Sequence, residues 1–273
     1  LVQVAAVGLK VEQPGDHLAA GTALLEVAHR SDLVRRVVLG VQPAKRQRGA
    51  VVQRNLLQLA RRVGRAKPSA IMVVAEKAKR LKAEGRDIIS FSIGVPNFLP
   101  GGHVYDAVRE ALSKDSGQYG SNRGSDALLD AFLKHMEAIG LTGYTRANIA
   151  TGIGAKHVIY NLAEVLLDEG DTIAFPTPYW TSYLDIADIV DAKIDLLPCP
   201  PEQDYKLTPA QLDAALAKKP KVFLFNNPSN PTGMVYDKDE IAALADVLVK
   251  YPDTWIITDD IYNRMVFDGV GYH

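Results

Sequence analysis

The chain has 273 residues, of which 47% are hydrophobic and 23% charged, and its formal net charge at pH 7 is -1. This composition is typical of folded globular proteins and excludes disorder as the general state. Because the charges balance, the composition predicts neither a nucleic-acid nor a membrane partner, and we expect a small-molecule ligand.

Residues 1–55 differ from the rest of the chain. They contain eight Lys or Arg residues against four acidic ones, and their apolar residues follow neither the strand nor the helix period. One interpretation is a basic DNA-binding module. The other, which we favour because no helix-turn-helix pattern is present, is a poorly ordered extension outside the main domain.

From about Leu56 onward, apolar runs of strand length alternate with amphipathic stretches of helical length. This alternation predicts an α/β fold with three layers (α/β/α), in which helices cover both faces of a mostly parallel sheet. The expected strands are Ile88–Ser92, Ile149–Gly152, Thr172–Phe175, Ile194–Leu197, Val222–Phe225 and Trp255–Thr258. The expected helices are Ile71–Ala83, Val104–Ser113, Asp126–Ala138, Lys156–Leu167, Thr181–Ile189, Pro209–Ala217 and Lys238–Lys250.

A turn of small residues, Gly152–Ala155, separates one expected strand from the next helix. Small residues allow a ligand to approach the backbone, and the first amides of a helix attract phosphate or carboxylate. Such turns also occur for packing reasons alone. Trp180 follows the next strand and could stack on a planar ring, although large aromatic residues more often fill a core.

The sequence NNPSNPTG, Asn226–Gly233, follows the expected strand VFLF directly. It forms a rigid polar turn, which its Asn, Pro and Gly residues would also favour for structural reasons alone. The last expected strand leads into Asp259, with Tyr262 three residues later. Ligands of open α/β sheets bind beyond the carboxyl ends of strands, and a buried acid there requires a cationic partner such as a protonated ring nitrogen.

The ordered set GIGAKH, PYWTSY, NNPSNPTG and DDIY resembles the pyridoxal-phosphate-dependent aminotransferases of fold type I, class I/II. The resemblance covers roughly Leu57–Gly269 and includes RVGRAKPSAI, ISFSIGVPNF and QYGSNRG farther upstream. It implies that residues 1–55 lie outside the family region and that residues 56–100 form the N-terminal arm and part of a small domain. Residues 101–273 would form the cofactor-binding large domain, incomplete at its C-terminus.

The resemblance implies that pyridoxal 5'-phosphate is the cofactor and that four residues contact its ring. Asp259 would pair with the pyridine nitrogen and keep it protonated, so that the ring draws electrons from the substrate. Asn230 and Tyr262 would hydrogen-bond the phenolic oxygen of the ring, and Trp180 would stack on its face.

The resemblance also implies how the phosphate and the substrate are held. Gly154, Ala155 and Lys156 would bind the phosphate at a helix start, and Tyr119 would reach the phosphate of the neighbouring subunit in a homodimer. Gly94 would line the carboxylate of the substrate. An amino acid and a 2-oxo acid would be the two substrates.

The chain departs from the family pattern at several positions. His157 stands where relatives often carry glutamine, and VPNF, with Val95 and Asn97, stands where an EPDF-like sequence is more common. These differences put the substrate pocket in doubt. The lysine that forms the Schiff base with the cofactor is expected beyond His273, the last residue, and residues 259–273 contain no lysine. We therefore expect that no catalytic residue is present, and that the chain is a fragment without turnover.

Two alternatives belong to other functional classes. A lyase or decarboxylase of the same fold would use the same ring contacts and break a different bond. A transcription regulator with an aminotransferase-like domain would need residues 1–55 to bind DNA. Cys199 is the only cysteine, and no membrane segment or secretory signal is evident. We therefore expect a cytoplasmic location, no membrane partner and no cysteine-based metal site.

Overall fold

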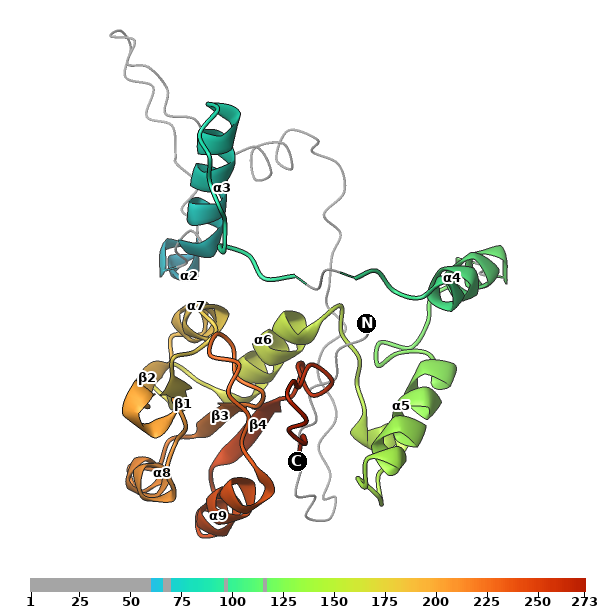
Figure 1. Ribbon diagram of the computed structural model, residues 1–273. Helices are drawn as coiled ribbons and strands as arrows, with labels where there is room; N and C mark the ends of the chain where they lie inside the picture. Colours follow the sequence, from blue (N-terminus) through green and yellow to red (C-terminus); the bar gives the residue numbers. More distant parts are fainter. Residues whose placement is uncertain (1–59, 66–69, 96–97, 115–116) are drawn as a thin grey trace, which may run out of the picture. The chain divides into compact units, whose positions relative to one another are not determined.

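A computed structural model of the chain describes residues 60–65, 70–95, 98–114 and 117–273. The predictions for residues 1–55 lie outside these ranges. Four parallel strands form a sheet in the order β2-β1-β3-β4 (Figure 1). The strands are β1 (Thr172–Thr177), β2 (Lys193–Pro198), β3 (Val222–Asn226) and β4 (Trp255–Asp259). Because β2 and β3 lie on opposite sides of β1, the strand order reverses beside β1, and such a reversal opens a crevice at the carboxyl ends of the strands.

Helices cover both faces of the sheet, as the alternating pattern predicts. One face packs against α6 (Ala155–Leu166) and α7 (Ser182–Ile189), and the other against α8 (Pro209–Leu216) and α9 (Lys238–Leu248) (Figure 1). Strand β3 contributes to both cores, because successive side chains of a strand point to opposite faces. Val222 and Leu224 join the first core, and Phe223 and Phe225 join the second.

The helix ends follow local sequence signals. Thr208 caps α8 and accepts a hydrogen bond from the Gln211 amide at 3.3 Å, and Asp237 caps α9 with Glu240 in the reciprocal role. These are capping boxes, in which two otherwise unpaired amides are satisfied. The predicted cap at Thr208 is confirmed, and the observed bounds of α8 and α9 lie within two residues of the prediction.

The helices before the sheet are α2 (Arg61–Arg65), α3 (Ala70–Ala83), α4 (Gly102–Lys114) and α5 (Asp126–Ala138), followed by the short 3-10 helix η1 (Arg146–Asn148). Arg65 donates from Nε to the Asp188 carbonyl at 2.7 Å and from Nη2 to the Ile189 carbonyl at 3.0 Å, which satisfies the carboxyl end of α7. Within the described ranges, no helix has the length and apolar character needed to cross a membrane.

Two strand predictions are wrong. Residues 88–92 form no strand, and Phe91 in this segment is 92% exposed. Residues 149–152 form no strand either, and Ile149 packs into a separate small core with Leu129 and Phe132 of α5. Both segments have strand-like composition, but among the described residues neither lies beside a strand with which it could form backbone hydrogen bonds.

Candidate active site

The strongest concentration of polar contacts among the sequence-predicted residues lies where β3 and β4 end. Asn226 and Asp259 are the last residues of these strands and are register partners. Asn226 donates from Nδ2 to the Asp259 carbonyl at 2.7 Å and accepts a hydrogen bond from the Asn230 amide at 2.8 Å. The side chain of Asn226 therefore joins the end of β4 to the turn that carries Asn230.

Asp259 is a buried carboxylate, with 4% of its surface exposed. It accepts hydrogen bonds from the Tyr183 hydroxyl at 2.6 Å and from the Ile261 amide at 3.3 Å. Burial raises the pKa of Asp259, and these two hydrogen bonds act in the opposite direction. In the described part of the chain, no Lys, Arg or His forms an ion pair with it. The site therefore contains a buried acid that lacks a cation.

Asn230 and Tyr262 lie together, although they are 32 residues apart in sequence. Asn230 donates from Nδ2 to the Tyr262 hydroxyl oxygen at 3.1 Å. The hydroxyl hydrogen of Tyr262 therefore remains able to donate to another group. A small cleft, with room for little more than a water molecule, lies at the carboxyl ends of β1 and β3, and its lining includes Tyr179, Asn226 and Asn230 but not Tyr262.

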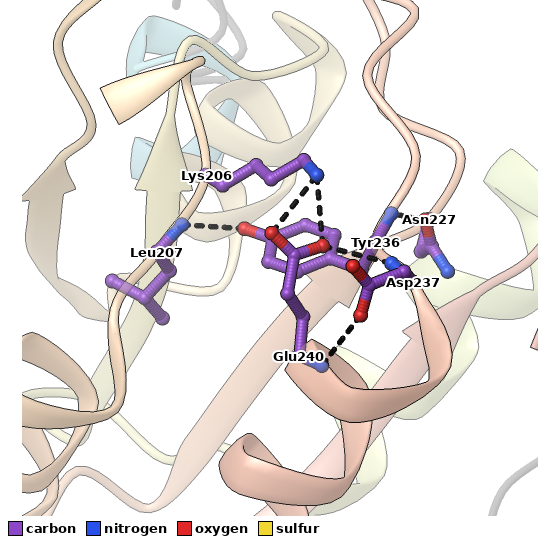
Figure 2. Close-up of polar contacts among 6 residues, drawn as sticks. All are labelled: Lys206, Leu207, Asn227, Tyr236, Asp237 and Glu240. Carbon is purple, nitrogen blue, oxygen red and sulfur yellow. Dashed lines mark hydrogen bonds and ion pairs between the residues drawn. The ribbon is translucent and has the colours of Figure 1, made fainter. Parts of the chain in front are cut away.

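The turn that carries Asn230 is anchored on its far side, as Figure 2 shows. Asn227 accepts a hydrogen bond from the Tyr236 amide at 3.1 Å, and the Tyr236 hydroxyl accepts one from the Leu207 amide at 2.5 Å. Lys206 forms an ion pair with Glu240 at 2.8 Å beside the same tyrosine (Figure 2). These contacts join the Asn226–Gly233 turn to the segment before α8 and to the start of α9.

Trp180 lies between the start of α6 and the buried acid. The Nζ atom of Lys156 is 5.0 Å from the centroid of the indole ring. Trp180 also meets Tyr183 edge to face, with 5.5 Å between ring centroids. The structure thus brings Lys156, Trp180 and Asp259 into one chain of contacts, because Tyr183 itself bonds to Asp259.

The small-residue turn precedes α6 with a backbone that requires glycine. Gly154 is the N-cap of α6 and has a φ of 144°, a conformation that residues with a side chain rarely adopt. At Gly152, an added Cβ would lie 2.7 Å from a methyl carbon of Val158, so this position tolerates no side chain without movement. Gly154 offers no side-chain cap to the helix. The turn therefore presents backbone to a ligand at a helix start, where anions bind favourably.

Tyr119 and Gly94 do not join this arrangement. Both residues are exposed, and Tyr119 is fully so. Among the described residues, no hydrogen bond or ion pair connects either one to the strand ends. Their proposed roles, in the neighbouring subunit and at the substrate carboxylate, therefore receive no geometric support from within the chain.

The segment that follows Tyr262 supplies no amine to the site. Residues 259–273 contain no lysine, and the last residue, His273, is exposed. A Cβ added at Gly271 would lie 2.8 Å from Nε2 of His273, so the imidazole folds back onto its own segment. In the part of the chain that the structure describes, no hydrogen bond or ion pair joins His273 to Asp259. The Schiff-base lysine expected beyond His273 therefore stays a prediction.

Tyr183 is a site residue that the sequence did not indicate. It is 2% exposed and lies on the inner side of α7, so its position in the sequence reads as ordinary core. The available signal was its spacing, since Tyr183 follows Trp180 by three residues and thus about one helical turn. The sequence indicates Asn226 only as part of a polar turn. Its hydrogen bond to the Asp259 carbonyl forms because β3 and β4 are neighbours in the sheet, and the sequence does not show this order.

Comparison with known proteins identifies the family. Residues 86–272 match the family model described as aminotransferase class I and II. The chain belongs to this family. Its members are enzymes that depend on pyridoxal phosphate, which agrees with the expectation drawn from the motifs.

Individual aminotransferases of the family resemble the chain over most of its length. The aspartate/prephenate aminotransferase of Cereibacter sphaeroides is 37% identical over 76% of this chain and 52% of its own length. The aspartate aminotransferase of Geobacillus stearothermophilus is also 37% identical, over 78% of this chain and 54% of its own. The crystal structure of the Rhizobium meliloti aspartate aminotransferase has a TM-score of 0.75 and 32% identity, and covers 79% of this chain and 54% of that structure. The chain thus spans about half the length of these relatives.

Proposed function

We propose that this chain supplies the cofactor cradle of an aminotransferase that moves an amino group from an amino acid to a 2-oxo acid with pyridoxal 5'-phosphate. The observation that carries the proposal is the buried carboxylate of Asp259 at the end of β4. A buried acid without a cationic partner is costly unless a ligand supplies the positive charge. A protonated pyridine nitrogen has that charge and a single N–H donor.

The neighbours of Asp259 would fix its orientation toward the ring. The Tyr183 hydroxyl binds Oδ2 of Asp259, and the Ile261 amide binds Oδ1. Carboxylate oxygens accept more than one hydrogen bond, so one of these oxygens could also accept from the ring nitrogen. When bound, the cofactor would supply an electron sink for reactions at the substrate's Cα. The protein's part is to hold the carboxylate in place through these two hydrogen bonds.

Asn230 and Tyr262 are suited to the phenolic oxygen of the ring. Because Asn230 already donates to the Tyr262 oxygen, the Tyr262 hydroxyl is free to donate its own hydrogen to a ligand oxygen. Donors of this kind favour the ionised form of that oxygen. Trp180, which lies between Lys156 and Tyr183, would cover the ring face.

Gly154, Ala155 and Lys156 would hold the phosphate at the start of α6. The glycine backbone at Gly154 lets the ligand come close, and the partial positive charge of the helix start favours an anion. The charged Lys156 side chain adds to that attraction. Gly94 would line the substrate carboxylate. In a homodimer, Tyr119 would contact the phosphate in the other subunit, and its full exposure leaves it available for that contact.

Aspartate is the amino-acid substrate that we propose to test first. The relatives from Cereibacter sphaeroides and Geobacillus stearothermophilus carry aspartate in their names. We further propose that the 273-residue chain by itself holds the cofactor without a covalent bond and does not turn over. Lys156 lies over Trp180 at the phosphate end of the site, and residues 259–273 contain no lysine.

The substitution Asp259→Asn tests the cradle. Equilibrium dialysis of the chain against pyridoxal 5'-phosphate should show affinity reduced about tenfold or more, because a hydrogen bond to a charged group contributes about 1.5–3 kcal/mol. Asp260→Asn is the matched control, since Asp260 is the adjacent acid and bonds instead to Thr258 at 3.0 Å. This control should bind within about twofold of the unmodified chain.

Circular dichroism on both variants would verify that they are folded. Equal affinity in folded Asp259→Asn and Asp260→Asn would reject Asp259 as the ring partner. Borohydride reduction followed by peptide mapping, with aspartate and a 2-oxo acid present in a parallel assay, tests the second part. A single trapped lysine together with steady transamination would contradict non-covalent binding.

A further inference from the structure

His157 occupies a defined position in the first turn of α6. With Gly154 as the N-cap, Ala155, Lys156 and His157 are the first three helical residues. In a capping box the third residue is Glu or Gln, and its side chain accepts a hydrogen bond from the backbone amide of the N-cap residue. His157 makes a related contact one residue earlier, because its Nδ1 accepts from the Ile153 amide at 3.3 Å. The Gly154 N-cap contributes no side-chain bond of its own.

The bond to Nδ1 sets the tautomer, because a neutral ring whose Nδ1 accepts carries its hydrogen on Nε2. Nε2 of His157 lies 3.2 Å from Nδ2 of Asn161, one helical turn further on. In this tautomer the Asn161 amide is turned so that its oxygen, in place of Nδ2, accepts from Nε2. The ring also packs on the turn, since an added Cβ at Gly152 would lie 2.9 Å from Nδ1.

We propose that His157 is a positioning residue for the phosphate turn, and that its neutral imidazole holds the Ile153 amide so that the start of α6 is ordered for an anion. The inference rests on the proposed function, in which Gly154, Ala155 and Lys156 bind the cofactor phosphate. His157 acts through the backbone of the turn and needs no contact with the cofactor.

A glutamine at this position could accept the same hydrogen bond through its side-chain oxygen, whereas an alanine could not. In the described ranges His157 forms no ion pair. Its role in the turn is therefore tested by exchanging the hydrogen-bond acceptor.

The experiment compares the unmodified chain with His157→Gln and His157→Ala, using pyridoxal 5'-phosphate as the probe. At pH 8, His157→Gln should bind within about twofold of the unmodified chain, and His157→Ala about threefold to tenfold more weakly, the effect of one neutral hydrogen bond.

Equal affinity of His157→Ala and the unmodified chain would overturn the proposal. Equally weak binding by His157→Gln and His157→Ala would also overturn it, because glutamine can replace the hydrogen bond and should therefore restore binding. Hydrogen exchange of the Ile153 amide without cofactor gives an independent readout. At pH 8, protection should be lost in His157→Ala and retained in His157→Gln, and equal exchange in all three chains would reject the cap.

The exchange experiment separates the two proposals. If the unmodified chain bound no cofactor but its Ile153 amide were protected as expected, the proposed function would fail and the role of His157 in the turn would stand. If the cofactor bound and the amide were equally exposed in all three chains, the cradle would stand and the cap would fail.

Discussion

The ends of β3 and β4 contrast with the segment from Ile88 to Tyr119. At the strand ends, Asp259 and Asn227 are buried. Asp259 accepts a hydrogen bond from Tyr183, which is 76 residues away in sequence, and the Asn227 amide donates to the Asp259 carbonyl. In the other segment, α4 has no buried residue, and Tyr119 is fully exposed. The ring side of the proposed site is therefore built by the sheet itself, whereas the substrate side gains little from packing within the described residues.

The difference follows from how each region buries apolar surface. The strands of a parallel sheet that is covered on both faces are held in place by two hydrophobic cores. The positions of the side chains at the strand ends are therefore fixed as well. A helix that buries no residue depends on its own backbone hydrogen bonds, and isolated helices shorter than about 12–15 residues are marginal in water. We therefore expect local opening of α4 well before the sheet unfolds.

The largest expected difference in the free energy of unfolding is between two leucine-to-alanine substitutions, one in the sheet and one in α4. Leu224 in β3 is 1% exposed, and Leu112 in α4 is 70% exposed. We expect Leu224→Ala to lower the free energy of unfolding by about 2–5 kcal/mol, through lost burial and a cavity. Leu112→Ala should change it by less than about 0.5 kcal/mol. Urea unfolding followed by circular dichroism measures both, and similar losses would mean that α4 is packed as firmly as the sheet.

A smaller effect is expected from Tyr236→Phe, which tests the anchor of the Asn230 turn. Tyr236 and Leu207 are each 3% exposed, and the substitution removes the acceptor of the Leu207 amide. An unpaired buried amide costs about 1–3 kcal/mol. The free energy of unfolding should fall by that amount, and affinity for pyridoxal 5'-phosphate should fall as the turn loosens. The exposed Tyr144 gives the control Tyr144→Phe, which should alter neither quantity.

The two-core sheet could be predicted from the sequence, because periodicity reports which face of an element is buried. The apolar runs at β1, β2, β3 and β4 sit among helices of the right length, and all four strands are confirmed. Ile88–Ser92 and Ile149–Gly152 have the same composition, but composition does not show whether a partner strand lies alongside. Whether these two segments form strands depends on pairing with a strand that is distant in sequence, and a single sequence does not reveal that pairing.

The proposed site was predictable to the extent that strand ends coincide with polar motifs. Asn230 and Tyr262 were expected at one place and lie 3.1 Å apart. Tyr183 was missed because a tyrosine on the apolar side of a helix has no distinguishing pattern, and only the fold brings its hydroxyl 2.6 Å from Asp259. The role of His157 in its turn likewise depends on the φ of Gly154, which sequence alone leaves open.

The smallest expected effect is a difference between the free energies of unfolding of Asp259→Asn and the unmodified chain as pH is varied. This difference tests whether the Asp259 carboxylate destabilises the folded chain when no ligand is bound. Burial raises the pKa of Asp259 above the ordinary value of 3.8. The folded chain therefore binds more protons than the unfolded chain from about pH 3.8 up to the raised pKa, and the free energy of unfolding contributed by this group falls as pH rises through that window. Asp259→Asn removes the titration, so the variant should gain stability relative to the unmodified chain between pH 4 and 7.

Acids that do not interact with Asp259 remain in the variant, so their contributions cancel in the difference. Asp171, whose pKa is lowered by its hydrogen bond to Lys221, is one of them. Asp260 does not cancel completely, because burial raises its pKa and the charge of Asp259 raises it further. Removal of that charge acts in the same direction as the loss of Asp259 itself and adds to the gain in stability. Urea unfolding at each pH gives the profile, with the exposed Asp253→Asn as the matched control. If the gain of Asp259→Asn were the same at pH 4 and pH 7, Asp259 would hold no uncompensated charge. The expected growth of that gain with pH would instead mean that the ionised Asp259 carboxylate destabilises the folded chain in the absence of a ligand, which is the charge that a cationic ring nitrogen would compensate.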